Sequence, residues 1–258
     1  MSAGLFRRER RVSGERGTSL VEAMVAVGLG VIVIGAALDV FVTHHGQFRL
    51  QRIKAELQQD LRGGTYLLAG ELRLAGSGAS GVQPVLTTVA MEEVAFRANV
   101  NDVRGTLLAA AASGQNGVQV PSGSGWRKGK TIVICGAEGC EEQVLAQDCL
   151  SGRLVFLGHL TRDFPVGSGV EVVNRVRYYL NRKEPKNLKV MREVDGGANP
   201  LIEHVEEFSL TYLNGSGRRT GRMEEIRLVR LKLRTGSLDG RGGRVSRSHT
   251  QEIGVRAL

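Results

Sequence analysis

Aromatic side chains are scarce in this chain, at 5% of 258 residues, whereas glycine occurs 35 times. A helical bundle normally has large side chains in its core and few glycines within its helices. Short strands joined by glycine-containing turns tolerate this composition better. The composition therefore favours a loop-rich β domain over a helical bundle.

The sequence also lacks the residue patterns of common catalytic and metal sites. No serine or cysteine occupies a Gly-x-Ser-x-Gly setting between a strand and a helix. His44 and His45 are adjacent, so on a helix their side chains would point about 100° apart. His159, His204 and His249 are isolated from one another. We therefore expect no enzyme activity, no metal and no cofactor.

Residues 122–131 come close to a phosphate-binding loop but break its pattern. Gly129-Lys130-Thr131 fits the end of the motif, yet Ser124 stands where a glycine is required. An apolar run, 131–135, follows at the point where phosphate binding needs the N-terminus of a helix. We predict a turn between two strands here and not a nucleotide site.

Three cysteines, at positions 135, 140 and 149, fit an exported domain with one disulfide and one spare thiol. If residues 141–147 form a strand, Cys140 and Cys149 lie about 30 Å apart, well beyond the roughly 7 Å that a disulfide allows. Cys135 and Cys140 flank Gly-Ala-Glu-Gly, which can fold back into a small ring. We favour the pair Cys135–Cys140. A three-thiol zinc site is the competing interpretation, and it is a poor one without a nearby histidine.

Acidic residues are fewer than basic ones, and the net charge is +9. Residues 215–258 contain eleven lysines or arginines and four acids. A basic face can meet DNA, anionic lipid or an acidic protein. Because no aromatic residues lie among these arginines to stack on bases, we favour a solvated basic surface, with a nucleic-acid site as the alternative.

The most distinctive segment is Gly17-Thr18-Ser19-Leu20-Val21-Glu22, between an arginine-rich leader and an apolar run. Five arginines precede it, and residues 23–38 follow without a charge. As a helix, residues 20–42 would be about 34 Å long, enough to cross a bilayer. Glu22 at the edge of this span is costly unless it finds a cationic partner.

Two plainer interpretations of this segment remain open. Residues 20–42 could be a single-pass anchor with an incidental Glu22 at its boundary. Alternatively, they could belong to an ordinary secretory signal, with Gly35 and Ala37 as the small residues of its cleavage site. The leader arginines favour a cytoplasmic N-terminus only weakly, because further basic residues follow the span.

An apolar stripe continues beyond the span at three- and four-residue steps, through Leu50, Ile53, Leu57 and Leu61. Gly63-Gly64 should weaken or kink this helix, and Tyr66-Leu67-Leu68 and Leu72 should resume the stripe. We expect the helix to end by Gly76 and to pack on a sheet.

Beyond residue 80 the sequence consists of short β-type runs bounded by Gly, Asn, Asp or Ser. The runs are residues 94–98, 118–120, 131–135, 143–146, 153–157, 170–180, 188–192, 205–213 and 226–233. The last run alternates, with a slip at 228–229 that indicates a bulge, and Gly236-Ser237 should end it. The alanine-rich residues 107–112 could be a short helix or a buried turn. A long helix before antiparallel strands predicts an α+β fold.

The order of basic leader, glycine, polar step, glutamate and apolar helix resembles the prepilin signal of type IV pilins and type II secretion pseudopilins. The resemblance implies cleavage by prepilin peptidase between Gly17 and Thr18 and N-methylation of Thr18. It also implies that Glu22 guides assembly by docking on the terminal amine of a neighbouring subunit. The family usually has Phe after the cut, and Thr18 departs from that pattern.

Later segments resemble PilW-like minor pilins in the same order: residues 58–62, 68–76, 176–180, 188–192 and 201–208. The resemblance implies a leader at 1–17, a long helix at 18–76 with its membrane span at about 20–42, and an exported β-rich domain at 77–258. It implies a pilin-like fold and insertion in the inner membrane. The expected partners are other minor pilins and the major pilin, in a complex that primes or caps a type IV pilus used in twitching motility.

Two alternatives share the same helix. J-type pseudopilins of type II secretion have the same layout. A DNA-binding uptake pilin would use the late arginines and would bind duplex DNA in a salt-sensitive way. An anchored enzyme has no motif in its favour.

Overall fold

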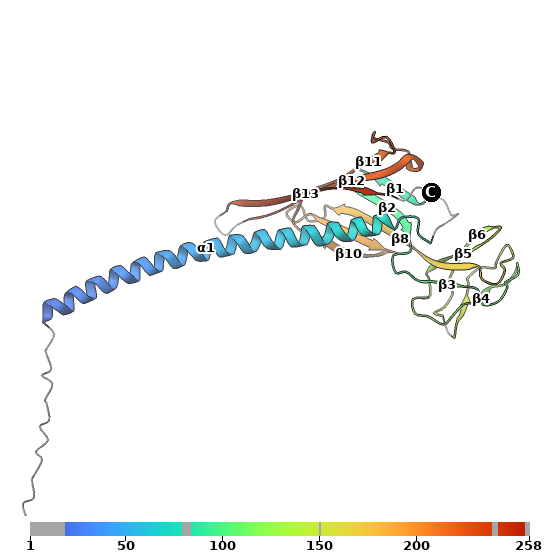
Figure 1. Cartoon of the computed structure of the whole chain (residues 1–258), viewed down its shortest axis with the longest axis horizontal. Coiled ribbons are helices and arrows are strands. Elements are labelled where there is room, and N and C mark those ends of the chain that lie inside the picture. The colour runs from blue at the N-terminus through green and yellow to red at the C-terminus, as the bar shows by residue number, and fades with distance from the viewer. Residues whose placement is uncertain (1–18, 79–83, 150, 239–241, 256–258) are drawn as a thin grey trace, which may run out of the picture. The chain divides into compact units, whose positions relative to one another are not determined.

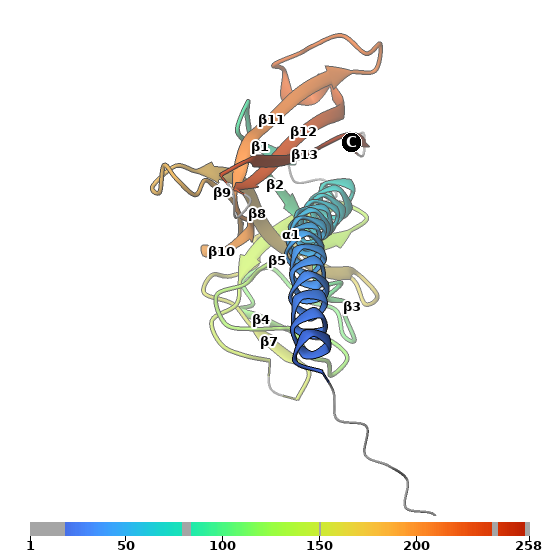
Figure 2. The ribbon, with the colours of Figure 1, turned by 90° about the vertical axis from the view of Figure 1, so that its left-hand side faces the viewer.

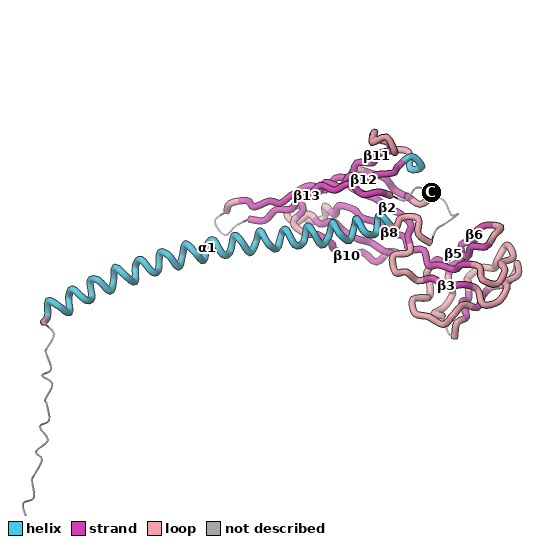
Figure 3. The backbone as a smooth tube through the Cα atoms, in the orientation of Figure 1, coloured by secondary structure: helices cyan, strands magenta, loops and turns pink. Residues whose placement is uncertain are grey.

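The computed structural model describes residues 19–78, 84–149, 151–238 and 242–255. Within them, one long helix, α1 (Leu20–Arg73), precedes a series of antiparallel strands (Figure 1). Strands and their connecting loops make up nearly all of the chain after α1 (Figure 3). The predicted α+β layout is confirmed. Gly17 and Thr18, with the rest of the leader, lie outside the described residues.

The chain divides into two compact units, Met1–Gln51 and Arg52–Leu258, and α1 crosses the division. The last part of the helix belongs to the second unit because Leu61, Leu68 and Leu72 are buried in the core that the strands form. The end of α1 therefore packs as part of the second unit.

The second unit contains three sheets within its described residues. The largest has eight strands: β1 (Leu86–Ala90), β2 (Glu93–Ala98), β3 (Arg104–Thr106), β5 (Thr131–Gly136), β6 (Gly139–Val144), β8 (Gly169–Asn181), β9 (Lys189–Val194) and β10 (Gly197–Ile202). The second sheet, gathered as one layer in Figure 2, consists of β11 (Val205–Asn214), β12 (Ile226–Leu238) and β13 (Arg244–Gly254). The third pairs β4 (Gly117–Gln119) with β7 (Arg153–Val155), and a 3-10 turn, η1 (Met223–Glu225), precedes β12.

Strand β8 connects two hydrophobic cores. Its residues 169–173 pair with β5, and its residues 174–179 pair with β2. Val170 and Val172 enter the second core, which includes Leu107, Trp126, Ile132, Leu154 and Phe164. Val176 and Tyr178 enter the first core, which includes Leu68, Leu72, Phe208, Leu231 and Ile253. Within each core the contributing side chains are two residues apart and share one face of β8, as the pleat of a strand requires. Val173, on the opposite face, is buried in a small separate cluster with Val133.

Helix α1 differs from the predicted stripe in two ways. It runs unbroken through Gly63-Gly64, and a Cβ on Gly64 would lie 2.3 Å from the Ile202 Cδ1 of β10. Glycine is therefore needed there for close approach of helix and strand. Leu68 and Leu72 are buried as predicted, but Tyr66 is 80% and Leu67 38% exposed. Those two residues lie on the face turned away from the core, since each residue advances the helix by about 100°.

Most predicted runs coincide with strands, and the exceptions have local causes. The predicted run 143–146 overlaps only the end of β6, which begins at the hairpin turn at Gly139. The alanine-rich segment 107–112 is irregular and forms a single bridge from Ala111 to Phe164, so it is not a helix. The irregularity in β12 falls at Arg227, one residue before the predicted slip, because Leu213 pairs with Leu228 and Asn214 with Ile226.

The prediction that Gly236-Ser237 ends the last strand is wrong. Strand β12 continues to Leu238, because β13 pairs with it as far as Leu238 and Arg244. A Cβ on Gly236 would lie 1.7 Å from the Oε1 of Glu206. This glycine therefore makes room for a side chain from β11 inside the sheet and does not mark a turn.

Candidate functional site

The first half of α1 is an apolar surface without a partner. Among the described residues, α1 is the one helix that is long and apolar enough to cross a membrane, and none of its most apolar stretch is buried in the chain. Its exposed large apolar side chains include Leu20, Val25, Leu29, Ile32, Ile34, Leu38, Phe41 and Phe48. Such a continuous apolar surface is unstable in water and requires lipid or protein to cover it.

Glu22 lies in the first turn of this helix and is exposed. The helix begins with a backbone hydrogen bond from Ala23 N to Ser19 O of 3.1 Å. A carboxylate in the first turn is favoured by the partial positive charge of the unpaired N–H groups. Within the described part of the chain, Glu22 forms no ion pair and no side-chain hydrogen bond. It remains available to a cation from outside the chain.

The far end of the apolar stretch meets polar residues. Phe41 and His45 are in ring contact, with centroids 5.7 Å apart. Arg52 and Glu56 follow as an exposed ion pair of 2.8 Å on the next turns. Asp39 and His44 are exposed near the same point. This succession is typical of a helix that leaves an apolar medium for water.

Cys135 and Cys140 form a disulfide across the β5–β6 hairpin, the pair that the sequence analysis favoured. Cys149 is a free, half-buried thiol that packs against the second core. Because two of the three thiols are bonded to each other, the competing three-thiol zinc site is excluded. The described residues contain no group of three or more His, Cys, Asp or Glu side chains that could hold a metal.

The segment that resembles a phosphate loop is a connection into β5. Trp126 is buried in the second core, and Thr131 begins the strand. Lys130, which a phosphate loop would direct at its ligand, forms an ion pair with Asp195. The segment therefore lacks both the helix and the free lysine that phosphate binding needs.

Several of the late basic residues are paired with acids of the same sheet. Arg230 binds Glu252 at 2.7 Å, and Lys232 binds Glu207 at 2.7 Å. Arg244 binds the Oε1 of Glu206 at 2.7 Å. These pairs lower the net positive charge that this sheet presents to a polyanion.

A buried polar cluster that sequence reasoning missed joins α1 to the sheet. Glu71 accepts hydrogen bonds from the Tyr178 hydroxyl and the Arg192 guanidinium, including one of 2.9 Å from Arg192 Nε. Burial, followed by the nearby Glu71 carboxylate, raises the pKa of Tyr178. The hydrogen bond to Glu71 raises the pKa of Arg192. The one available signal was an acidic residue between the apolar positions Leu68 and Leu72.

Models of known protein families and the sequences of curated proteins show no match to this chain.

Proposed function

We propose that this protein is a PilW-like minor pilin. It is inserted in the inner membrane by α1, cut between Gly17 and Thr18, and assembled with other minor pilins and the major pilin. The resulting complex primes or caps a type IV pilus. The observation that supports this best is the Glu22 carboxylate, which has no ion-pair partner among the described residues and lies in the first turn of a helix whose apolar side chains are exposed.

Assembly would cover that helix and neutralise that carboxylate in one step. After cleavage, the new α-amine of a neighbouring subunit is a cation of the right kind for Glu22. In a filament core of packed apolar helices the two charges attract far more strongly than in water. The second unit, with its sheets exposed, would supply the contacts that select particular subunits.

A pseudopilin of type II secretion would use the same helix in the same way. Deletion of the gene separates the two roles: loss of surface pili and twitching indicates the pilus, and trapped periplasmic exoproteins indicate secretion. Three of the late basic residues, Arg230, Lys232 and Arg244, are already paired with acids, which weakens the argument for a DNA-uptake role.

The first test is the intact mass and N-terminal sequence of the protein from its native membrane. We expect a chain that begins at Thr18. A chain that begins at Met1 would leave a plain anchor, and one that begins near Leu38 would indicate a secreted domain. Either result would contradict the proposal.

A second test separates processing from assembly. We expect Glu22→Ala to be cleaved normally and to remain in the membrane but to be lost from sheared filaments. The matched control is Asp39→Asn, which removes an acid from the other end of the same helical stretch. Equal recovery of both variants in filaments would show that Glu22 has no role in assembly.

A further inference from the structure

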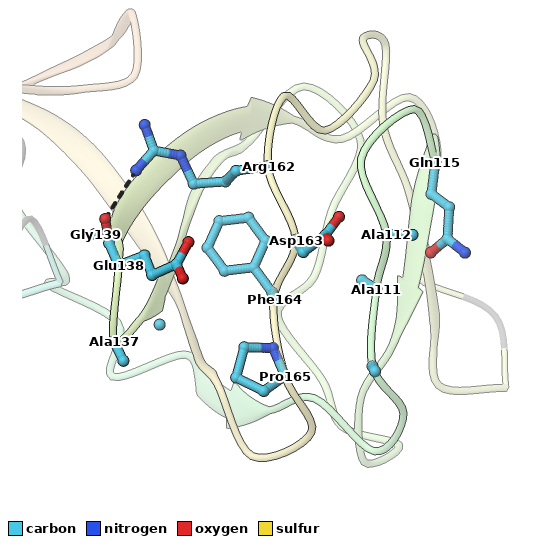
Figure 4. Close-up of a pocket in the computed structure, with 12 residues that line it drawn as sticks. Ala111, Ala112, Gln115, Ala137, Glu138, Gly139, Arg162, Asp163, Phe164 and Pro165 are labelled. Carbon is cyan, nitrogen blue, oxygen red and sulfur yellow. Dashed lines mark hydrogen bonds between the residues drawn. The ribbon is translucent and has the colours of Figure 1, made fainter.

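A pocket of about 490 Å³ opens in the second unit between three segments of the chain (Figure 4). They are the irregular segment around Ala111, the tip of the β5–β6 hairpin at residues 136–139, and residues 162–165. No sequence motif pointed to it, because the three segments are distant in the chain.

The walls of this pocket are held in place. The Cys135–Cys140 disulfide closes the ring that contains the hairpin tip. Ala111 and Phe164 exchange two backbone hydrogen bonds, each 2.8 Å long. Arg162 Nη1 donates to the carbonyl oxygen of Glu138 at 3.2 Å and ties the two remaining segments together. A pocket with fixed walls binds without the entropic cost of ordering its loops.

The floor of the pocket is apolar and its rim is acidic. Ala111 and Phe164 are buried and form the floor. The carboxylates of Glu138 and Asp163 lie on opposite sides of the Phe164 ring in Figure 4. Neither carboxylate forms an ion pair with another described residue. Asp163 Oδ1 accepts a hydrogen bond of 2.7 Å from the Ser113 backbone N–H.

Arg162, a cationic residue that lines the same pocket, forms no ion pair with either carboxylate among the described residues. Its guanidinium is turned to the backbone of the hairpin, where Gly139 leaves room for it: a Cβ there would lie 2.7 Å from Nη1. The two carboxylates therefore face the solvent in a chain whose net charge is otherwise strongly positive, at +9.

We propose that this pocket binds a lysine or arginine side chain presented by a partner protein. The aliphatic stem of such a side chain would cover the apolar floor, and its cationic head would lie between Glu138 and Asp163. An anionic ligand would meet two carboxylates instead. The proposal does not depend on the pilin assignment, because it rests on the second unit alone.

The test uses the full chain in detergent micelles with ¹³C-labelled alanine methyl groups, because Ala110, Ala111, Ala112 and Ala137 line the pocket. The probe is N-acetyl-lysine methylamide, and the matched ligand is N-acetyl-norleucine methylamide, which has an aliphatic stem without the charge. We expect saturable shifts of these alanine signals with the lysine compound. We expect much weaker shifts with the norleucine compound, and weaker lysine binding at high salt.

Variants distinguish the pocket from general attraction to acidic surface. Glu138→Gln should raise the Kd of the lysine compound about two- to fivefold, the effect of one exposed charge pair. Glu224→Gln, which neutralises an exposed carboxylate outside the pocket, should leave the Kd unchanged. Shifts that do not saturate, equal binding of the norleucine compound, or an unchanged Kd in Glu138→Gln would each overturn the proposal.

Discussion

At the residue scale, two glutamates of α1 have opposite environments. Glu22 lies exposed in an apolar helix without a partner in the described chain, whereas Glu71 is buried with two partners. A carboxylate on an apolar helix is costly in a membrane unless a cation lies near it. A buried and satisfied carboxylate holds elements together, at a cost in desolvation. Both glutamates belong to α1, and they differ in exposure and in hydrogen-bond partners.

Replacing Glu71 with alanine should destabilise the second unit by about 2 kcal/mol or more, because the Tyr178 hydroxyl and the partly buried Arg192 would lose their partner. The matched control is Glu56→Ala, whose pair with Arg52 is exposed and should cost at most about 0.5 kcal/mol. Thermal unfolding followed by circular dichroism measures both. Equal melting temperatures for the two variants would contradict the structural role of Glu71.

Asp195 should make stability depend on acid pH. Burial alone would raise the pKa of Asp195, but hydrogen bonds from Lys130, Asn174 and the Arg175 backbone outweigh it and lower the pKa. The pKa of Asp195 in the folded chain therefore lies below its unfolded value of about 3.9. The ionised carboxylate contributes fully to the free energy of unfolding above about pH 3.9, and this contribution is lost as the pH falls through the folded pKa.

Asp195→Asn should therefore lower the free energy of unfolding at pH 7, and the gap to the unaltered chain should close as the pH falls below about 4. Urea unfolding at a series of pH values provides the measurement. A gap that stays constant down to pH 2 would mean that the charge of Asp195 contributes nothing.

At the element scale, α1 has two successive glycines with opposite surroundings. A Cβ on Gly64 would meet the side chain of Ile202 at 2.3 Å, whereas a Cβ on Gly63 would meet nothing within 4 Å. One glycine is needed for the packing of helix on strand β10. The other is in open space and lowers helix stability without a packing benefit inside this chain.

Gly64→Ala should therefore destabilise the second unit by about 1–3 kcal/mol through overpacking against Ile202. Gly63→Ala, its neighbour in the sequence, should instead stabilise the helix by up to about 1 kcal/mol. The pair Gly64→Ala with Ile202→Val should recover part of the loss. Destabilisation of similar size in both single variants would show that the glycines serve helix flexibility and not packing.

At the scale of the whole molecule, the two units differ in whether their apolar side chains are buried within the chain. The described part of the first unit exposes most of its apolar side chains, whereas the second unit buries most of its own in two large cores and a small third cluster. A stable fold in water needs its apolar side chains buried in a core, as in the second unit. The core residues of α1 begin at Leu57, after the division at Gln51.

A chain that begins at Arg52 should remain monomeric in water without detergent and keep its melting temperature within a few degrees of the full-length value. The full chain should need detergent or lipid to stay monomeric. Size-exclusion chromatography and circular dichroism of both chains test this. Aggregation of the shorter chain would show that residues before Arg52 are required for the fold of the second unit.

The sequence by itself determined the features that depend on neighbours in the chain. The apolar run predicts α1, the order of residues 17–22 places Glu22 at its start, and the spacing of Cys135 and Cys140 favours their pairing. Each follows from helix periodicity, local charge or the reach of a short ring, so a window of some twenty residues is enough.

The tertiary structure alone decided which residues meet across the chain. Glu71 and Tyr178 are 107 positions apart. Gly236 lies within β12 because β13 pairs beside it, and the Glu206 side chain occupies the space that a Cβ would take. The acidic pocket joins three segments that are distant in the chain. No local pattern encodes these contacts, because each joins residues from elements that are separated in the chain and meet only in the fold. The fold also decides that Glu71 is buried with hydrogen-bond partners and that Glu22 is exposed.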